Sequence, residues 1–420
     1  MTGAAARFTT ADGWRYGLLG LPLAFVALPL YVLLPNHYAR AFGVPLAALG
    51  VVLLVARLFD AFLDPWLGRV ADRLFARTPA AVLRFGWVAA AFLALGFALL
   101  FFPPVRGTTA LLAWAAFALA WTYLAYSALS IAHQSWGAML GGDAAQRSRV
   151  VAWREGCGLA GVLLASLLPL LAGLAASAAA LGVLLALACW AWQSGPRPRT
   201  AAGASGADWR TPFARAPFRR LLAVFVLNGI ASAVPATLVL FFVQDRLQAP
   251  AAMEPLFLGS YFLSAAIAIP LWVAAVPRFG LARAWLAGIL LAIAAFAGAS
   301  QLGAGDTWAF LAICIAAGAA LGTDLALPGA LLAGVIAAAG DGGRAEGAYF
   351  GWWNFATKLN LALAAGLALP LLALAGYTPG SRDPEALDAL TLAYCVLPCV
   401  LKLAAAALLY LLLIHKETAE

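Results

Sequence analysis

Residues 57–73 read RLFDAFLDPWLGRVADR and begin inside a long apolar run. Arg57, Asp60 and Asp64 follow one another at intervals of three and four residues, so on a helix they share one face. Ionisable side chains are costly to bury in a membrane, and they usually face the bundle interior or a water-filled cavity. The stretch therefore predicts a membrane helix whose charged face has a functional role.

The composition of the whole chain supports a membrane protein. Of the 420 residues, 65% are hydrophobic and only 10% are charged, and the mean hydropathy is +0.93, which is far outside the range of soluble domains. The five cysteines have no metal-ligand spacing and are interpreted as buried thiols. We expect no cofactor, no metal site and no nucleic-acid partner.

Twelve apolar runs are long enough to cross about 30 Å of hydrocarbon, which takes about 20 helical residues. They cover residues 16–38, 44–67, 80–102, 108–138, 149–173, 176–194, 218–245, 254–276, 281–302, 307–337, 346–375 and 387–414. The predicted fold class is therefore an all-α polytopic membrane protein.

The longest polar interruption, residues 194–220, follows the sixth run and is rich in Gly, Pro, Ala and Arg. It predicts an N-terminal six-helix bundle over 1–194, a cytoplasmic linker over 195–217 and a C-terminal six-helix bundle over 218–420. The short loops GRVADR and PRFGLAR occupy corresponding positions after runs two and eight. Two parallel repeats of six spans are typical of the major-facilitator fold.

The basic residues predict the orientation. Most of the 26 Lys and Arg residues lie in segments on the same side as the N-terminus, whereas the opposite loops carry only Arg40, Arg106, Arg246 and Arg382. Positive charge accumulates on the cytoplasmic side of membrane proteins. We therefore expect a monomer in the bilayer of the cell inner (plasma) membrane, with both termini cytoplasmic. This placement also explains the net charge of +8 without invoking nucleic acid.

Asp60 and Asp64 lie one helical turn apart, so their carboxylates can converge on one cation or share one proton. A charge-neutralised contact between helices is the alternative. Lys358 is isolated in the apolar eleventh run. It either partners these carboxylates or extends its amine to the cytoplasmic surface. Lys402 has no such neighbours in the sequence and is interpreted as structural, and the role of Asp324 is left open.

Other polar side chains could line a central cavity or form gates. His133 either lines that cavity or is a core imidazole, and Trp136 and Tyr123 either stack on a sugar ring or only pack. The segment GRAEG, which contains Arg344 and Glu346, is predicted to form charge pairs that close the cytoplasmic side. The DAAQRSR loop before the fifth run is expected to do the same.

The chain contains neither the glycine loop of ATP-binding proteins nor a set of residues for nucleophilic catalysis. We therefore expect a protein that is not an enzyme. An ion gradient is the natural energy source for a membrane protein with buried carboxylates.

Three motifs resemble those of the glycoside–pentoside–hexuronide:cation symporter family, the melibiose permease-like transporters of the major facilitator superfamily. The first is R-x-x-D-x-x-x-D-P-x-x-G-x-x-x-D-R over residues 57–73. The second comprises YSAL (126–129), WGAML (136–140), R-x-R (147–149) and AWRE (152–155). The third is R-x-E-G-x-Y-F-G-x-W-x-F-x-x-K over residues 344–358.

The resemblance implies a set of residue roles. Asp60 and Asp64 would bind the coupling cation, Arg154 would reach the substrate, and Lys358 together with Arg57 would couple the two sites. The remaining expected roles are gate contacts by Asp72, Arg73, Arg344 and Glu346, and substrate contacts by Tyr123, Ser130, His133 and Trp136.

The chain also departs from the family pattern. The segment 17–29 lacks the acid that binds sugar in the relatives, and Leu63 replaces an Asn beside the second carboxylate. Asp60, Asp64 and the Ser127 hydroxyl form a thin shell for sodium, which needs several oxygen ligands. We therefore expect coupling to a proton rather than to sodium.

The predicted function is cation-coupled symport of a small-molecule substrate, either a sugar or a related small polar solute. A transporter of a more apolar solute, such as a lysolipid, is the first alternative. A non-transporting membrane sensor with the same fold is the second.

Overall fold

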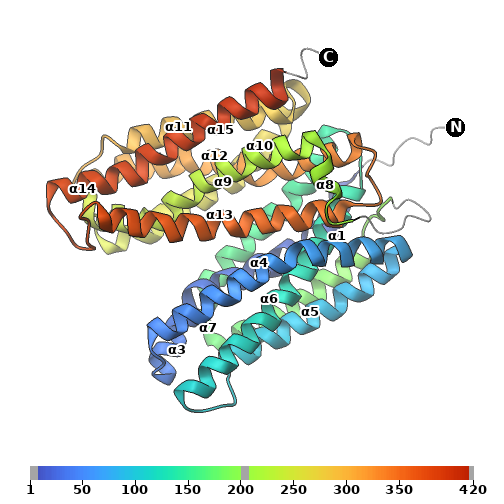
Figure 1. Cartoon of the computed structure of the whole chain (residues 1–420), viewed down its shortest axis with the longest axis horizontal. Coiled ribbons are helices and arrows are strands. Elements are labelled where there is room, and N and C mark those ends of the chain that lie inside the picture. Colours follow the sequence, from blue (N-terminus) through green and yellow to red (C-terminus); the bar gives the residue numbers. More distant parts are fainter. Residues whose placement is uncertain (1–7, 200–207, 416–420) are drawn as a thin grey trace. The chain divides into compact units, whose positions relative to one another are not determined.

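The computed structural model describes residues 8–199 and 208–415, and all regular elements within these ranges are helical (Figure 1). The predicted linker lies partly outside them. The α-helices are α1 (Thr10–Gly17), α2 (Gly20–Leu28), α3 (Leu34–Phe42), α4 (Leu46–Arg77), α5 (Pro79–Phe101), α6 (Thr108–Met139), α7 (Ala144–Gln193), α8 (Thr211–Ala214), α9 (Ala216–Phe241), α10 (Glu254–Phe279), α11 (Leu281–Ala299), α12 (Thr307–Ala338), α13 (Glu346–Leu374), α14 (Pro384–Thr391) and α15 (Leu397–Leu409).

Short π-helical and 3₁₀ turns continue several of these helices. The π-helical turns are Pro29–Leu33, Phe242–Arg246, Leu392–Val396 and Tyr410–Ile414, and the 3₁₀ turn is Ala251–Met253.

The chain forms two compact units. Unit 1 comprises Met1–Ala214 together with Ala333–Phe355, and unit 2 comprises Arg215–Leu332 together with Ala356–Glu420. In unit 1, α2 packs on α7, while α4 and α5 both pack on α6. In unit 2, α9 and α11 pack on α15. The end of α12 and the start of α13 thus belong with the N-terminal helices, whereas the boundaries proposed from the sequence, 1–194 and 218–420, remain a prediction.

Eight described helices are long and apolar enough to cross a membrane. One of them, α7, contains 50 residues and is broken at Gly173, where φ is +83°, so it supplies the fifth and sixth predicted spans. The first, second and eleventh predicted spans correspond to α1–α3, α4 and α13. Within the described residues, the twelve predicted spans therefore all have helical counterparts.

Helix α4 is longer than its predicted span, 44–67, because the GRVADR segment continues the helix to Arg77 instead of forming a turn. The interpretation of residues 68–73 as a loop was therefore wrong. Its Arg, Ala and Asp residues are compatible with a helix. The turn comes at Thr78, whose side chain accepts a hydrogen bond from the Ala81 amide at 3.1 Å and starts α5.

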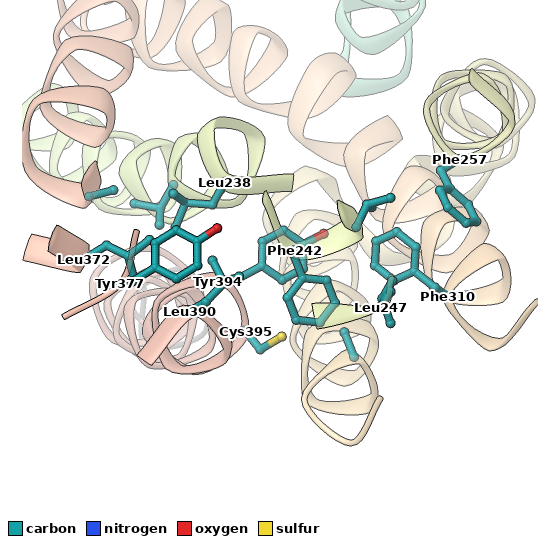
Figure 2. Packing of buried hydrophobic residues seen from close by; sticks show 14 of the residues in the cluster. Leu238, Phe242, Leu247, Phe257, Phe310, Leu372, Tyr377, Leu390, Tyr394 and Cys395 are labelled. Carbon is teal, nitrogen blue, oxygen red and sulfur yellow. The ribbon is translucent and has the colours of Figure 1, made fainter. Parts of the chain in front are cut away.

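Aromatic rings form much of the core of unit 2. Phe242 and Tyr394 stack with ring centroids 4.3 Å apart and an interplanar angle of 17°, and Figure 2 shows both rings between Leu390 and Phe310. Offset aromatic stacking adds to the free energy gained from burial of the rings. The Leu392–Val396 turn, which carries Tyr394, is thereby held against the end of α9.

Candidate functional site

The two α4 carboxylates lie on the buried face of their helix. Asp60 is 4% exposed and Asp64 is fully buried. Helix α6, which packs on α4, places the Ser127 hydroxyl where it donates a hydrogen bond to Asp60 Oδ1 at 2.7 Å. A buried carboxylate with a fixed hydroxyl donor is chemically suited to holding a proton or a small cation.

Glycine residues allow α13 to approach α4 closely next to these acids. A Cβ atom on Gly68 would lie 2.1 Å from the Gly347 carbonyl oxygen, and one on Gly351 would lie 2.6 Å from the Asp64 carbonyl oxygen. Small residues at such contacts let membrane helices pack backbone to backbone. The start of α13 is therefore part of the environment of Asp64 within unit 1.

Asp72, one turn after Gly68 on α4, connects α4 to α13. Its carboxylate accepts hydrogen bonds from the backbone amides of Gly347 at 2.6 Å and Ala348 at 2.8 Å, and its residue is 1% exposed. The first amides of a helix lack partners within the helix and carry partial positive charge. Asp72 thus binds the N-terminus of α13.

The predicted gate residues do not form the charge pairs expected from the sequence. Glu346 is buried, and its side chain accepts a hydrogen bond from the amide of Gly343, which lies in the loop before α13, at 2.7 Å. Arg344 is exposed and donates to the Gly340 carbonyl, and Arg73 is exposed on α4. In this structure the carboxylates of Asp72 and Glu346 therefore bind backbone amides, and the gate role of these residues remains a prediction.

Three of the residues predicted to contact the substrate lie on α6 and near the start of α7, and all three are buried or half-buried. Arg154 pairs with its neighbour Glu155, with Nη2 2.5 Å from Oε1. On α6, Ser130 is buried and accepts a hydrogen bond from Gln134 at 2.8 Å, and Tyr123 is buried as well. Any contact of Arg154, Ser130 or Tyr123 with a substrate remains a prediction.

His133 and Trp136 belong to the core of unit 1, and both are fully buried. The His133 ring stacks on Tyr16 at 4.3 Å, and its Nε2 lies 2.8 Å from the Tyr16 carbonyl oxygen. Trp136 donates to the Pro196 carbonyl at 3.0 Å and packs against Trp192. Both side chains therefore pack in the core of unit 1 in this structure, and any contact of either with a substrate remains a prediction.

The two predicted coupling residues belong to different units. Arg57 is half-buried on α4 in unit 1, and Lys358 is half-buried on α13 in unit 2. The partnership of Lys358 with the α4 carboxylates remains a prediction.

A second buried ionic site lies in unit 2, and the sequence analysis did not find it. Lys402 on α15 is 2% exposed at its side chain, and its Nζ lies 3.4 Å from Asp324 Oδ2 on α12. Lys402, which was interpreted from the sequence as structural, thus has an acidic partner on another helix. The two residues are 78 positions apart, and only the packing of the helices brings them together.

Neighbouring polar groups complete the hydrogen bonding of this pair. Asn228 and Trp285 donate to Asp324 Oδ1 at 2.9 and 2.8 Å, and Ser232 donates to Oδ2 at 3.3 Å. Lys402 also donates to Asn228 Oδ1 and Ser232 Oγ, both at 2.9 Å. Asp324 borders a cavity of about 190 Å³ between α9, α10, α11, α12 and α15.

Comparison with known proteins finds one protein family that matches nearly the whole chain. A family model described as "MFS/sugar transport protein" matches residues 15–416. No curated protein sequence matches the chain.

Several solved structures have the same fold. One is a bacterial homologue of the iron transporter ferroportin in the outward-facing state with soaked iron, with a TM-score of 0.69 and 16% sequence identity. The match covers 95% of this chain and 100% of that chain. A variant of the E. coli fucose:proton symporter FucP has a TM-score of 0.65 at 16% identity, with 98% of it and 93% of this chain covered. The human organic anion transporter MFSD10 (TETRAN) has a TM-score of 0.63 at 17% identity, with 100% and 96% covered.

Proposed function

Because this chain belongs to the family of MFS/sugar transport proteins, we propose that it is a cation-coupled symporter of a sugar or related small polar solute. It is a multi-pass membrane transporter of the major-facilitator fold and not an enzyme. The finer assignment to the melibiose permease-like symporters rests on the motifs over residues 57–73 and 344–358.

The observation that carries the proposal is the buried carboxylate pair of α4. Asp60 and Asp64 lie one turn apart, both are buried, and Ser127 donates to Asp60 at 2.7 Å. A charged group inside a membrane protein is retained where transport uses it, because its burial costs about 3 kcal/mol or more. A sensor or scaffold with the same fold would have no use for such a pair.

We assign the coupling ion as the proton. Sodium has to recover its lost hydration from several protein oxygens. Leu63, next to Asp64, supplies no side-chain oxygen. A proton requires only one carboxylate whose neighbours make proton uptake possible near neutral pH.

Transport by purified protein in liposomes tests this assignment. With a pH gradient and a sodium gradient imposed separately, we expect uptake of the transported sugar to follow the pH gradient. An inward sodium gradient alone should leave uptake at the level measured without any gradient. Uptake that follows sodium and ignores pH would show that the proton assignment is wrong.

The same assay addresses Lys358, which we assign to coupling. Lys358→Ala should bind and equilibrate the substrate but fail to accumulate it against a gradient. The reason is that the variant lacks the ammonium group that we assign to respond to the carboxylates of α4. Arg278→Ala, which removes a basic residue in the last turn of α10, serves as the control. If Lys358→Ala accumulates substrate at the wild-type level, Lys358 has no part in coupling and only extends its amine to the cytoplasmic surface.

For localisation, we propose the inner (plasma) membrane with both termini in the cytoplasm, from the distribution of Lys and Arg. Alkaline phosphatase fused after residue 205 or 420 should therefore be inactive, whereas a fusion after Arg106, in an opposite-side loop, should be active. An active enzyme at either of the first two positions would reverse the assigned orientation.

A further inference from the structure

We propose that the cavity of unit 2 is a binding site for a small organic cation, namely a protonated amine with an apolar body such as an aryl ring. All residues that line this cavity belong to unit 2. The proposal goes beyond the symport function, and it is tested by binding rather than by transport.

The size and lining of the cavity define the body of the ligand. Its volume is about 190 Å³, and an engineered apolar cavity of about 150 Å³ is large enough for benzene. The walls are mostly apolar and include the rings of Phe257, Tyr261, Phe296 and Tyr394. A ring or short chain can therefore leave water by entering this cavity, which is favourable.

Of the two charged side chains that line the cavity, the carboxylate is the more accessible. The Asp324 side chain is 18% exposed, whereas the Lys402 side chain is only 2% exposed, although both border the cavity. The faces of the surrounding aromatic rings also carry partial negative charge and attract cations. A cationic ligand is therefore favoured over an anionic one of the same shape.

Lys402 does not prevent Asp324 from binding a second cation. Its two shorter hydrogen bonds, both at 2.9 Å, are made to the neutral oxygens of Asn228 and Ser232, while its contact with Asp324 is longer, at 3.4 Å. The lysine thus keeps two acceptors when a ligand binds at Asp324 Oδ2, while Oδ1 keeps its hydrogen bonds from Asn228 and Trp285. A buried ammonium group with hydrogen-bond acceptors is tolerated, whereas one without them is not.

Tyr394 offers an additional acceptor inside the cavity. The residue is 5% exposed and lines the cavity, and no hydrogen bond of its hydroxyl is found within the described ranges. Its ring is held in place by the stack on Phe242 (Figure 2). Buried hydroxyl groups are normally hydrogen-bonded, so this one is available for an N–H donor of the ligand.

Three probes of nearly the same shape test the charge requirement on the purified full-length protein in nanodiscs. Phenethylamine is a cation, 2-phenylethanol is neutral and 3-phenylpropionate is an anion. We expect phenethylamine to bind about tenfold or more tightly than either of the others, the usual size of one charge-assisted hydrogen bond. Equal binding of the amine and the alcohol, after subtraction of binding to empty nanodiscs, would overturn the proposal.

Variants locate the site. Asp324→Asn should weaken phenethylamine binding about tenfold or more and Tyr394→Phe about threefold, the difference reflecting a charged and a neutral acceptor. Asp388→Asn, which changes an exposed carboxylate outside the cavity, should bind like the wild type. An Asp324→Asn protein that binds phenethylamine as tightly as Asp388→Asn would also overturn the proposal.

One further variant covers the case in which Asp324→Asn fails to fold because Lys402 loses its charged partner. Ala317, which is buried at the cavity wall, is replaced by Phe, so the ring occupies the cavity and leaves the ion pair intact. Ala317→Phe should abolish phenethylamine binding while its thermal unfolding remains cooperative. Binding at the wild-type level in this variant would show that the cavity is not the site.

Discussion

Replacing either α4 carboxylate should abolish accumulation of the substrate while leaving its equilibration intact. In Asp60→Asn and Asp64→Asn, the buried carboxyl group can no longer take up and release the coupling ion, so transport loses its connection to the gradient. For one proton per substrate, a gradient of 1 pH unit supports accumulation of up to about tenfold. In both variants, the ratio of the substrate concentration inside the proteoliposomes to that outside should be about one under an imposed pH gradient.

A pair of serine variants on α6 provides the matched control for this prediction. Ser127→Ala removes the hydroxyl that donates to Asp60 at 2.7 Å and should lower uptake several-fold. Ser135→Ala makes the same change on the same helix, at a fully buried hydroxyl with no hydrogen bond among the described residues. Ser135→Ala should transport like the wild type. Full accumulation by Asp60→Asn and Asp64→Asn would show that ion coupling occurs elsewhere.

The second large effect is expected at Asp72, through its contact with the N-terminus of α13. Both carboxylate oxygens accept a backbone amide, Gly347 at 2.6 Å and Ala348 at 2.8 Å. In Asp72→Asn, the side-chain NH₂ group must face one of these two N–H donors, so at least one hydrogen bond is lost. A hydrogen bond to a charged group contributes about 1.5–3 kcal/mol.

We therefore expect Asp72→Asn to lower the free energy of unfolding measured in detergent and to slow uptake about tenfold. The reason for the second effect is that we assign this contact to the cytoplasmic gate, which has to form and break in every transport cycle. Asp143→Asn is the control, because Asp143 caps α7 through the Gln146 amide at 2.7 Å and Asn caps a helix about as well as Asp. If Asp72→Asn shows wild-type uptake and stability, the assignment of Asp72 to the gate is wrong.

The glycine contact beside Asp72 explains why this carboxylate binds backbone amides rather than a side chain. A Cβ atom on Gly347 would lie 2.2 Å from the Gly68 carbonyl oxygen and 2.8 Å from Asp72 Oδ1. The two helices are therefore close enough for the carboxylate to reach the backbone amides directly. No arginine side chain is needed to satisfy the carboxylate at this position.

The membrane spans and the class of the protein could be read from the sequence. A span needs about 20 apolar residues because the bilayer has a fixed thickness and offers no partners for backbone amides, and this requirement is local. The shared face of Asp60 and Asp64 is also local, because it follows from the 3.6-residue period of the helix. The family model over residues 15–416 agrees with this class.

The partners of the buried polar groups were decided by the tertiary structure alone. Asp324 and Lys402 lie on α12 and α15, 78 residues apart, and nothing in either segment indicates the other. Asp72 binds the amides of α13 instead of an arginine, and His133 is enclosed by Tyr16 and Trp192. The physical reason is that hydropathy and periodicity determine which side of a helix avoids lipid, whereas the neighbour that this side meets depends on how distant helices pack.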